Sequence, residues 1–218
     1  MNMGGIPAVG SLAVLGAVAA WAWWPQEENG VTEPQLVANG PGRGVTQSPG
    51  NRVYLSSAQL QQALASKTLD RPVKSLLSVR GPLRFGDYEW NDRAVPDGPL
   101  WIRVDLGAQL MSVFLGGHEI GTSVIVYGGD NKQTPGGKLH ILARDKDHRS
   151  SIYDADMPYT LQLTYDGVAI HGSDVRQGRA THGCIGVPLE FARRLFDAAK
   201  VGDEVTIIRP AEAAPVQT

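Results

Sequence analysis

Residues 171–187 read HGSDVRQGRATHGCIGV, and the assignment of the fold depends on this stretch. It holds two of the chain's five histidines, His171 and His182, and its one cysteine, Cys184. Glycines beside polar residues do not suit packing in a hydrophobic core. An imidazole near a thiol suits nucleophilic catalysis, because it can take the thiol proton and later give it to a leaving amine. We therefore treat this stretch as a candidate active site.

The positions of these residues indicate separate roles. His171 comes at the end of a predicted strand, which holds a side chain better than a loop does, so it is the better candidate for a general base. Gly183 separates His182 from Cys184 and allows a sharp turn that can aim successive N–H groups at a developing oxyanion. A free cysteine has a pKa of about 8.5. The predicted helix at Pro188 begins four residues on, so its dipole would lower that pKa only modestly.

Two other interpretations of the cysteine stay open at this point. A lone cysteine is often a small buried hydrophobic residue, although the neighbouring His-Gly and the loop setting weigh against that here. A zinc site formed by His171, His182 and Cys184 has suitable ligands but no obvious fourth one. The remaining histidines are interpreted as ordinary polar residues of strands or loops: His118, His140 and His148.

Before this stretch, apolar residues alternate with polar ones, as in strands that bury one face. Predicted strands at Leu100–Leu106, Gln109–Leu115 and His118–Tyr127 are separated by two-residue turns that contain glycine. This spacing predicts an antiparallel meander. A further hairpin begins with the strand Leu161–Tyr165, and Asp166-Gly167 predicts a type I′ turn.

After this stretch comes the main predicted helix, Pro188–Val201, followed by a strand at Glu204–Arg209. The apolar stripe of the helix is formed by Phe191, Leu195, Ala198 and Ala199. The sequence therefore predicts a β-dominated α+β domain at residues 98–210, with a tail at 211–218.

A small lead-in segment, residues 52–97, precedes the domain. Ser57–Lys67 within it predicts a short helix, capped by Ser56 or Ser57. The rest of the segment is broken up by prolines and matches no functional module. We interpret it as packing support for the domain.

The N-terminal segment, residues 1–24, is apolar, and Met1–Gln26 contains no charged side chain. The run from Ile6 to Trp24 is near the lower limit of a membrane-spanning helix, and it ends in tryptophans that favour the membrane boundary. Small-x-small patterns also fit a cleavable signal peptide, and a buried core helix is the third alternative. The Gly/Pro-rich residues 25–51 predict a disordered linker. We therefore expect export, with membrane anchor and signal peptide left open.

Charge and cysteine content exclude several classes of protein. The chain carries 20 Lys and Arg against 22 Asp and Glu, for a net charge of −2, which gives a nucleic-acid partner no electrostatic support. One cysteine excludes intrachain disulfides and any all-cysteine metal cage. In an exported chain with no partner thiol, Cys184 cannot be trapped in an intramolecular disulfide and stays available as a nucleophile.

Two elements, Ile170-His171-Gly172 and Thr181-His182-Gly183-Cys184-Ile185, resemble the signature of the L,D-transpeptidase catalytic domain of bacterial cell-wall enzymes. The similarity runs from about Leu100 to Arg209 and includes the Thr134-Pro135 turn and the Met157-Pro158-Tyr159 stretch. It implies an L,D-transpeptidase-like mixed β-sandwich with one main helix after the catalytic cysteine.

The resemblance also assigns roles within the site. Cys184 is the implied nucleophile and His171 the implied general base, with the Gly172 carbonyl orienting the imidazole. Backbone N–H groups around His182–Cys184, with Gly183 between them, would form the oxyanion hole. The resemblance implies no metal and no organic cofactor. Four further residues are candidates for substrate binding: Tyr159, Arg176, Arg179 and Thr181.

The implied reaction is a two-step acyl transfer on peptidoglycan stem peptides. Cys184 attacks the amide between diaminopimelate and the terminal D-alanine of a stem tetrapeptide, and D-alanine leaves a thioester behind. An amine of a second stem peptide, or of a wall-anchored acceptor protein, then resolves the thioester. Carbapenem-type acylation of Cys184 is also implied. This function belongs to peptidoglycan biosynthesis, cell wall organization and cell shape, on the periplasmic side of the cell envelope, with the protein membrane-anchored or secreted.

The chain departs from the family pattern at two places. Family members commonly carry Arg or Asn where this chain has Gly186, and the loop between His171 and Thr181, nine residues, is short for the family. Arg176 and Arg179 in that loop are candidates to bind a stem-peptide carboxylate in compensation, or are solvated loop charges. Two alternative functions stay open: an L,D-carboxypeptidase or cysteine peptidase acting on stem peptides, and an inactive cell-wall-binding module.

Overall fold

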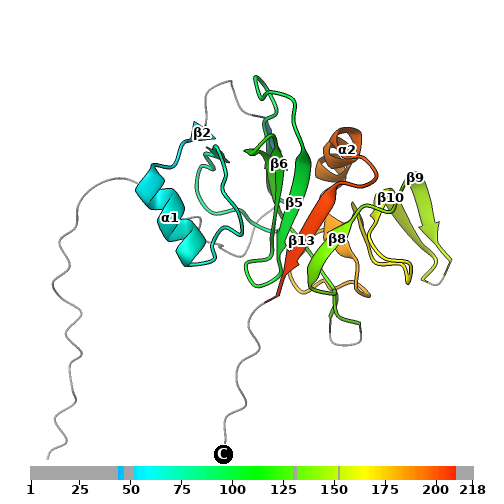
Figure 1. Ribbon diagram of the computed structural model, residues 1–218. Helices are drawn as coiled ribbons and strands as arrows, with labels where there is room; N and C mark the ends of the chain where they lie inside the picture. Colours follow the sequence, from blue (N-terminus) through cyan, green and yellow to red (C-terminus); the bar gives the residue numbers. More distant parts are fainter. Residues whose placement is uncertain (1–43, 47–51, 130–131, 152, 210–218) are drawn as a thin grey trace, which may run out of the picture. The chain divides into compact units, whose positions relative to one another are not determined.

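The computed structural model describes residues 44–46, 52–129, 132–151 and 153–209. These residues form thirteen strands and two helices (Figure 1). In chain order the elements are β1 (Gly44–Thr46), β2 (Arg52–Val53), α1 (Ser57–Ala65), β3 (Leu76–Leu77), β4 (Tyr88–Trp90), β5 (Leu100–Asp105), β6 (Leu110–Leu115), β7 (His118–Val124), β8 (Gly137–His140), β9 (Ala143–Ser150), β10 (Ala155–Gln162), β11 (Ala169–Gly172), β12 (Ile185–Val187), α2 (Leu189–Ala198) and β13 (Glu204–Ile208).

Several sequence predictions fall outside these residues. The anchor or signal segment at 1–24, most of the linker at 25–51 and the tail at 211–218 lie outside the described part of the chain. Three linker residues that are described, Gly44–Thr46, pair in parallel with β4 as strand β1. Among the described helices, none is long and apolar enough to cross a membrane.

The larger sheet has seven strands in the order β1-β4-β7-β6-β5-β13-β8. Its centre is the predicted antiparallel meander of β5, β6 and β7. Gly116 and Gly117 both have positive φ, 57° and 91°, as a tight turn between β6 and β7 requires. The last strand, β13, crosses back to pair in parallel with β5. The sequence prediction of a β-dominated mixed architecture is therefore confirmed.

The smaller sheet has four strands in the order β12-β11-β10-β9. The hairpin of β10 and β11 was predicted from the sequence, but the prediction of a type I′ turn at Asp166-Gly167 is wrong. A type I′ turn needs positive φ at both central residues, and of these two only Gly167 has it, at 95°. Gly167 N–H instead donates to the Thr164 carbonyl at 3.3 Å.

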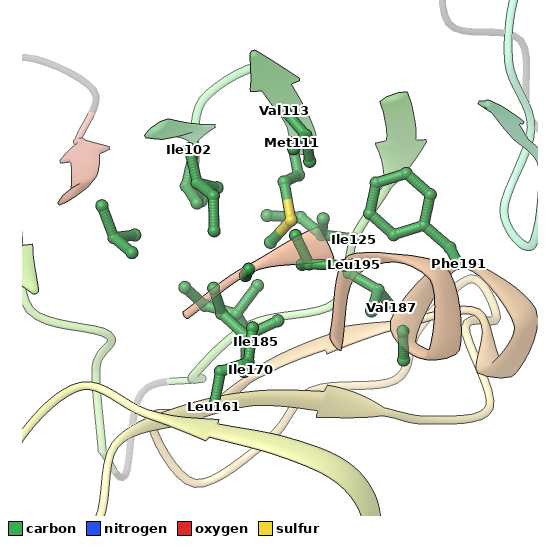
Figure 2. Close-up of a cluster of buried hydrophobic side chains, with 14 of the residues drawn as sticks. Ile102, Met111, Val113, Ile125, Leu161, Ile170, Ile185, Val187, Phe191 and Leu195 are labelled. Carbon is green, nitrogen blue, oxygen red and sulfur yellow. The ribbon is translucent and has the colours of Figure 1, made fainter. Parts of the chain in front are cut away.

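The main hydrophobic core lies between the two sheets, and α2 lies within it (Figure 2). Figure 2 shows Ile102, Met111 and Ile125 above Leu161, Ile170 and Ile185, with the helix beside both groups. The buried residues of α2 are Phe191, Ala192 and Leu195.

The predicted helical stripe and the helix end each need a correction. Ala198 is exposed, and the buried alanine of the helix is Ala192, about two turns before the stripe's last member, Ala199. The helix also ends at Ala198 rather than Val201, because Ala199 adopts an extended conformation. Gly202 then donates its N–H to the Ile141 carbonyl at 2.9 Å, outside any helix.

A second hydrophobic cluster joins the lead-in segment to the outer face of the larger sheet. The rings of Trp101 and Phe114 are paired across β5 and β6 and stack 3.9 Å apart. Helix α1, which Ser56 caps through a capping box, packs Leu60 and Leu64 against this cluster. The Arg71 guanidinium lies 4.5 Å above the Trp101 ring. The lead-in therefore covers a face that would otherwise expose two aromatic side chains to water.

A buried polar network also fixes the lead-in to β7. The Arg52 guanidinium donates to the carbonyls of Asn91 and Glu119, at 2.6 Å and 2.7 Å, and to the Ser75 hydroxyl at 3.2 Å. The Glu119 carboxyl accepts the N–H of Leu77 at 2.9 Å. Burial raises the pKa of Glu119 above its ordinary value.

Candidate active site

His171 lies in β11, and Cys184 lies directly before the neighbouring parallel strand β12. His171 in β11 is the direct partner of Gly186 in β12, and Cys184 comes two residues before Gly186. Side chains two positions apart share a face of a strand, so a backbone that is extended at Cys184 would put its side chain on the same face as His171. Ile170 and Ile185 project from the opposite face and are buried in the main core. The pairing of β11 with β12 thus anchors the neighbours of His171 and Cys184 in the core.

The imidazole of His171 is buried and oriented by its own chain. Its Nδ1 lies 2.9 Å from the Gly172 carbonyl, which can only accept a hydrogen bond, so Nδ1 carries the proton. The other ring nitrogen, Nε2, is then the basic one in the neutral ring. Burial lowers the pKa of His171, and a protonated His148 nearby would lower it further; the Gly172 hydrogen bond acts in the opposite direction.

Cys184 lies just before β12, against the turn between β10 and β11. Its Sγ is 3.5 Å from the carbonyl of Gly167. Burial raises the pKa of the Cys184 thiol, as does the charge of Asp166, whereas an N–H of Ala169 and the charge of Lys132 lower it. The Lys132 ammonium lies 3.8 Å from the Asp166 carboxylate, so two opposite charges flank the thiol.

The two shifts favour a neutral pair at rest. Because burial raises the pKa of Cys184 and lowers that of His171, the thiol keeps its proton and the imidazole stays unprotonated at neutral pH. A neutral imidazole within reach of a neutral thiol can act as a general base, taking the thiol proton during attack without a standing thiolate–imidazolium pair.

A second loop holds the backbone just before the cysteine. β7 leaves the larger sheet after Val124, and the chain then pairs Val126 with Gly186 and Gly128 with Thr181. The hydroxyl of Thr134 accepts the N–H of Gly128 at 2.9 Å and donates to the carbonyl of Gly183 at 3.0 Å. Val126, Gly128 and Thr134 therefore lie directly against the cysteine loop.

The residues on either side of Gly183 make separate contacts. Gly183 has φ of 97°, in the left-handed region that favours glycine. The Thr181 hydroxyl donates to the Cys184 carbonyl. The His182 ring is exposed and stacks on the Tyr153 ring, with centroids 4.2 Å apart. Tyr153 comes from the hairpin between β9 and β10, so this hairpin reaches the cysteine loop.

Gly186, the departure from the family pattern, is enclosed. A Cβ at this position would lie 2.7 Å from the Ser173 Cβ and 2.7 Å from a Val126 methyl carbon. Both directions of the Val126–Gly186 bridge are hydrogen-bonded, at 3.0 Å and 2.8 Å. The site therefore has no room for a side chain at position 186 without movement of Ser173 or Val126.

The other predicted binding residues lie in different surroundings. Arg176 and Arg179 are exposed and share one partner, Asp174, at 2.7 Å and 3.8 Å. The Tyr159 ring packs on Phe196 of α2, 5.8 Å between centroids, from a backbone with φ of 59°. A positive φ is unusual for a bulky residue. Their roles in substrate binding remain predictions.

Sequence reasoning did not identify Lys132, Thr134 and Asp166 as part of this site. Thr134-Pro135 was recognised only as a turn, and Asp166 only as a turn former. Neither Lys132 nor Asp166 is marked by a motif. In the described residues, no group of three or more His, Cys, Asp or Glu side chains is arranged to hold a metal ion.

The fold and the site together define a class of protein, a β-dominated catalytic domain with one helix packed between its sheets. A family model of the YkuD type, the L,D-transpeptidase catalytic domain, matches residues 99–207, which is half of the chain. The chain therefore belongs to this family. None of the curated proteins compared with the chain matched it.

Three solved structures that are similar to the chain are L,D-transpeptidases. One from Stackebrandtia nassauensis is 22% identical, with 53% of this chain and 58% of that one covered and a TM-score of 0.48. One from Mycobacterium smegmatis is 20% identical, with coverage of 50% and 58% and a TM-score of 0.47. A variant of the Enterococcus faecium enzyme is 25% identical, with coverage of 51% and 50% and a TM-score of 0.47. The chain spans about half the length of these proteins.

Proposed function

We propose that this chain is a peptidoglycan L,D-transpeptidase that uses Cys184 as nucleophile and His171 as general base. The observation that supports the proposal is the register of β11 and β12, in which His171 pairs with Gly186, two residues after Cys184. The Gly172 carbonyl fixes the tautomer of His171 that leaves Nε2 basic. Family membership supports the reaction class.

In the first step, a stem tetrapeptide is the acyl donor. Nε2 of His171 accepts the thiol proton as Sγ attacks the carbonyl of diaminopimelate, and a tetrahedral oxyanion forms. The amide C–N bond then breaks, and the imidazolium gives the proton to the nitrogen of the leaving D-alanine. A thioester on Cys184 remains.

In the second step, an amine attacks the thioester. His171 accepts a proton from that amine, the C–S bond breaks, and the proton returns to the thiol. An amine from a second stem peptide gives a cross-link, and one from a wall-anchored protein gives an attachment. Water in place of the amine gives carboxypeptidase activity.

The remaining parts of the chain fit a protein of the cell envelope. Residues 1–24 would act as membrane anchor or signal peptide and residues 25–51 as a linker, with the catalytic domain at 98–210 and its lead-in at 52–97. The domain would then work on the periplasmic side. Candidate contacts with the stem peptide are Tyr159, Arg176, Arg179 and Thr181.

The full chain incubated with tetrapeptide muropeptides tests the proposal, with products followed by mass spectrometry. A dimer formed with loss of D-alanine supports transfer. A monomeric tripeptide supports hydrolysis, and an unchanged substrate supports a wall-binding role.

Substitutions test the two roles separately. Cys184→Ala and His171→Gln are both expected to stop product formation, and a Cys184→Ala variant with full activity would refute the nucleophile. His140→Gln, in the exposed strand β8, is the matched histidine control and should keep the wild-type rate.

A further inference from the structure

The buried hydroxyl of Thr134 joins two backbone segments that meet beside the proposed nucleophile. The side chain is 1% exposed. Its oxygen accepts the Gly128 N–H and donates to the Gly183 carbonyl, at 2.9 Å and 3.0 Å. A serine or threonine hydroxyl has a single hydrogen to donate, and this one is committed to Gly183.

The hydrogen bond to Gly183 fixes more than one carbonyl. The C=O of Gly183 and the N–H of Cys184 belong to the same peptide group, and the described peptides are all trans. In a trans peptide the C=O and N–H point in opposite directions within one plane. Holding the carbonyl toward the buried hydroxyl therefore holds the Cys184 N–H pointing away from it.

Without this hold, the peptide would be free to rotate. Gly183 has no side chain to restrict its ψ, and its φ of 97° is already in a region that glycine tolerates. The Thr181 hydroxyl fixes the next carbonyl, that of Cys184. Two threonines from different loops therefore fix the peptide groups on either side of the Cys184 Cα.

The backbone at Gly128 and Thr134 lies close enough to Gly183 for the position of one segment to determine that of the other. A Cβ at Gly128 would lie 2.8 Å from the Gly183 Cα and 2.8 Å from the Thr134 N. Only a glycine at 128 lets the two backbones approach this closely. The backbone at Gly128 and Thr134 thus packs directly against the backbone at Gly183 and is not linked to it only through a long side chain.

We propose that Thr134 is a positioning residue that aims the Cys184 N–H at the oxyanion formed during acyl transfer. This inference rests on the proposed role of Cys184 as nucleophile. Preorganised N–H donors stabilise a tetrahedral oxyanion strongly because they need no reorientation during the reaction. Thr134 itself does not touch substrate; it acts through the Gly183–Cys184 peptide.

Two reagents that react with Cys184 in the full chain distinguish stabilisation of the oxyanion from an effect on the reactivity of the thiol itself. Iodoacetamide alkylates Sγ by displacement of iodide, which forms no oxyanion. 4-Nitrophenyl acetate acylates Sγ through a tetrahedral oxyanion: the acetyl group passes to sulfur, and 4-nitrophenolate leaves. The ratio of the two rates therefore reports on oxyanion stabilisation.

Thr134→Val removes the hydroxyl with little change in shape, and Thr134→Ser keeps it. Thr134→Val is expected to lower acylation about 100-fold, the loss typical of one oxyanion donor, while alkylation changes by less than about threefold. Thr134→Ser is expected to keep both rates near wild type. If the valine variant does not fold, Thr134→Ala should show the same split.

The outcomes distinguish this inference from the proposed function. Equal losses of alkylation and acylation in Thr134→Val, or full acylation, would overturn the positioning role and leave Cys184 as nucleophile. A split between the probes, with wild type inert on tetrapeptide muropeptides, would support the positioning role and overturn the proposed substrate.

Discussion

His171 and Gly186 are direct partners in the parallel pairing of β11 with β12. The proposed base therefore stands opposite a residue with no side chain, at the position where family members commonly carry Arg or Asn. Ser173 and Val126 close in on that position instead. The missing side chain is thus compensated by packing, which leads to the first prediction.

Gly186→Asn is expected to destabilise the fold. The new Cβ would lie 2.7 Å from atoms of both Ser173 and Val126, and forced contacts of this kind cost about 1–3 kcal/mol. The free energy of unfolding from urea titration checks this. Adding Val126→Ala, which removes one of the two contacts, should recover part of the loss. An unchanged unfolding free energy in the single variant would show that the site has room.

The activity of the enzyme should persist to lower pH than an ordinary imidazole allows. Burial lowers the pKa of His171, so its neutral, basic form survives below about 6.5. The acid limb of kcat/KM, which reports the free enzyme, is therefore expected below that value. An acid limb at or above 6.5 would contradict the assignment of His171 as a buried neutral base.

Lys132 and Asp166 should shift the thiol pKa in opposite directions. Lys132→Met keeps a long apolar side chain near Gly183 but removes the charge that lowers the pKa of Cys184, so that pKa should rise. Asp166→Asn removes a charge that raises it, so the pKa should fall. The pH dependence of iodoacetamide alkylation measures both. Shifts of the same sign would refute the electrostatic explanation.

Local patterns predicted the elements of this fold well, because each depends on neighbouring residues. The alternation at Leu100–Leu106 and the glycines at 116 and 117 were sufficient for the meander. The helix after Pro188 was also recovered. The errors were local too: the turn at Asp166 and the exposed Ala198 depend on backbone angles and helix phase that composition does not determine.

Contacts between distant segments could not be predicted in the same way. The hydrogen bond from Thr134 to Gly183 joins residues 49 positions apart in the sequence, and the contact of Lys132 with Asp166 joins residues 34 positions apart. Both contacts depend on the path of the chain after β7, and the pattern of apolar and polar residues does not predict that path. The motif at His171 and Cys184 could be recognised in the sequence because its two parts lie close together along the chain, one in β11 and one directly before β12.

Replacing the two loop arginines, Arg176 and Arg179, tests whether they bind substrate. Arg176 and Arg179 share Asp174 and are exposed, so replacing both with Gln should change stability by less than about 1 kcal/mol. If they bind a stem-peptide carboxylate, KM for a tetrapeptide donor should rise about tenfold with kcat little changed. Asp174→Asn, which frees both arginines, should not raise KM. Unchanged kinetics in the double variant would remove the compensating role.

Two glutamates should respond to pH with opposite signs. Burial raises the pKa of Glu119 in the folded state, so folding takes up a proton, and stability falls as pH rises from the unfolded pKa toward the folded one. Glu119→Gln lacks this loss and should gain stability relative to wild type between pH 4 and pH 8. The hydrogen bond from Arg71 lowers the pKa of Glu204, so its contribution is present at neutral pH and lost on acidification. Glu204→Gln should therefore lose stability relative to wild type over the same range, as measured by urea titration at each pH. Parallel curves for Glu119→Gln and wild type would show that the buried carboxyl does not hold its proton.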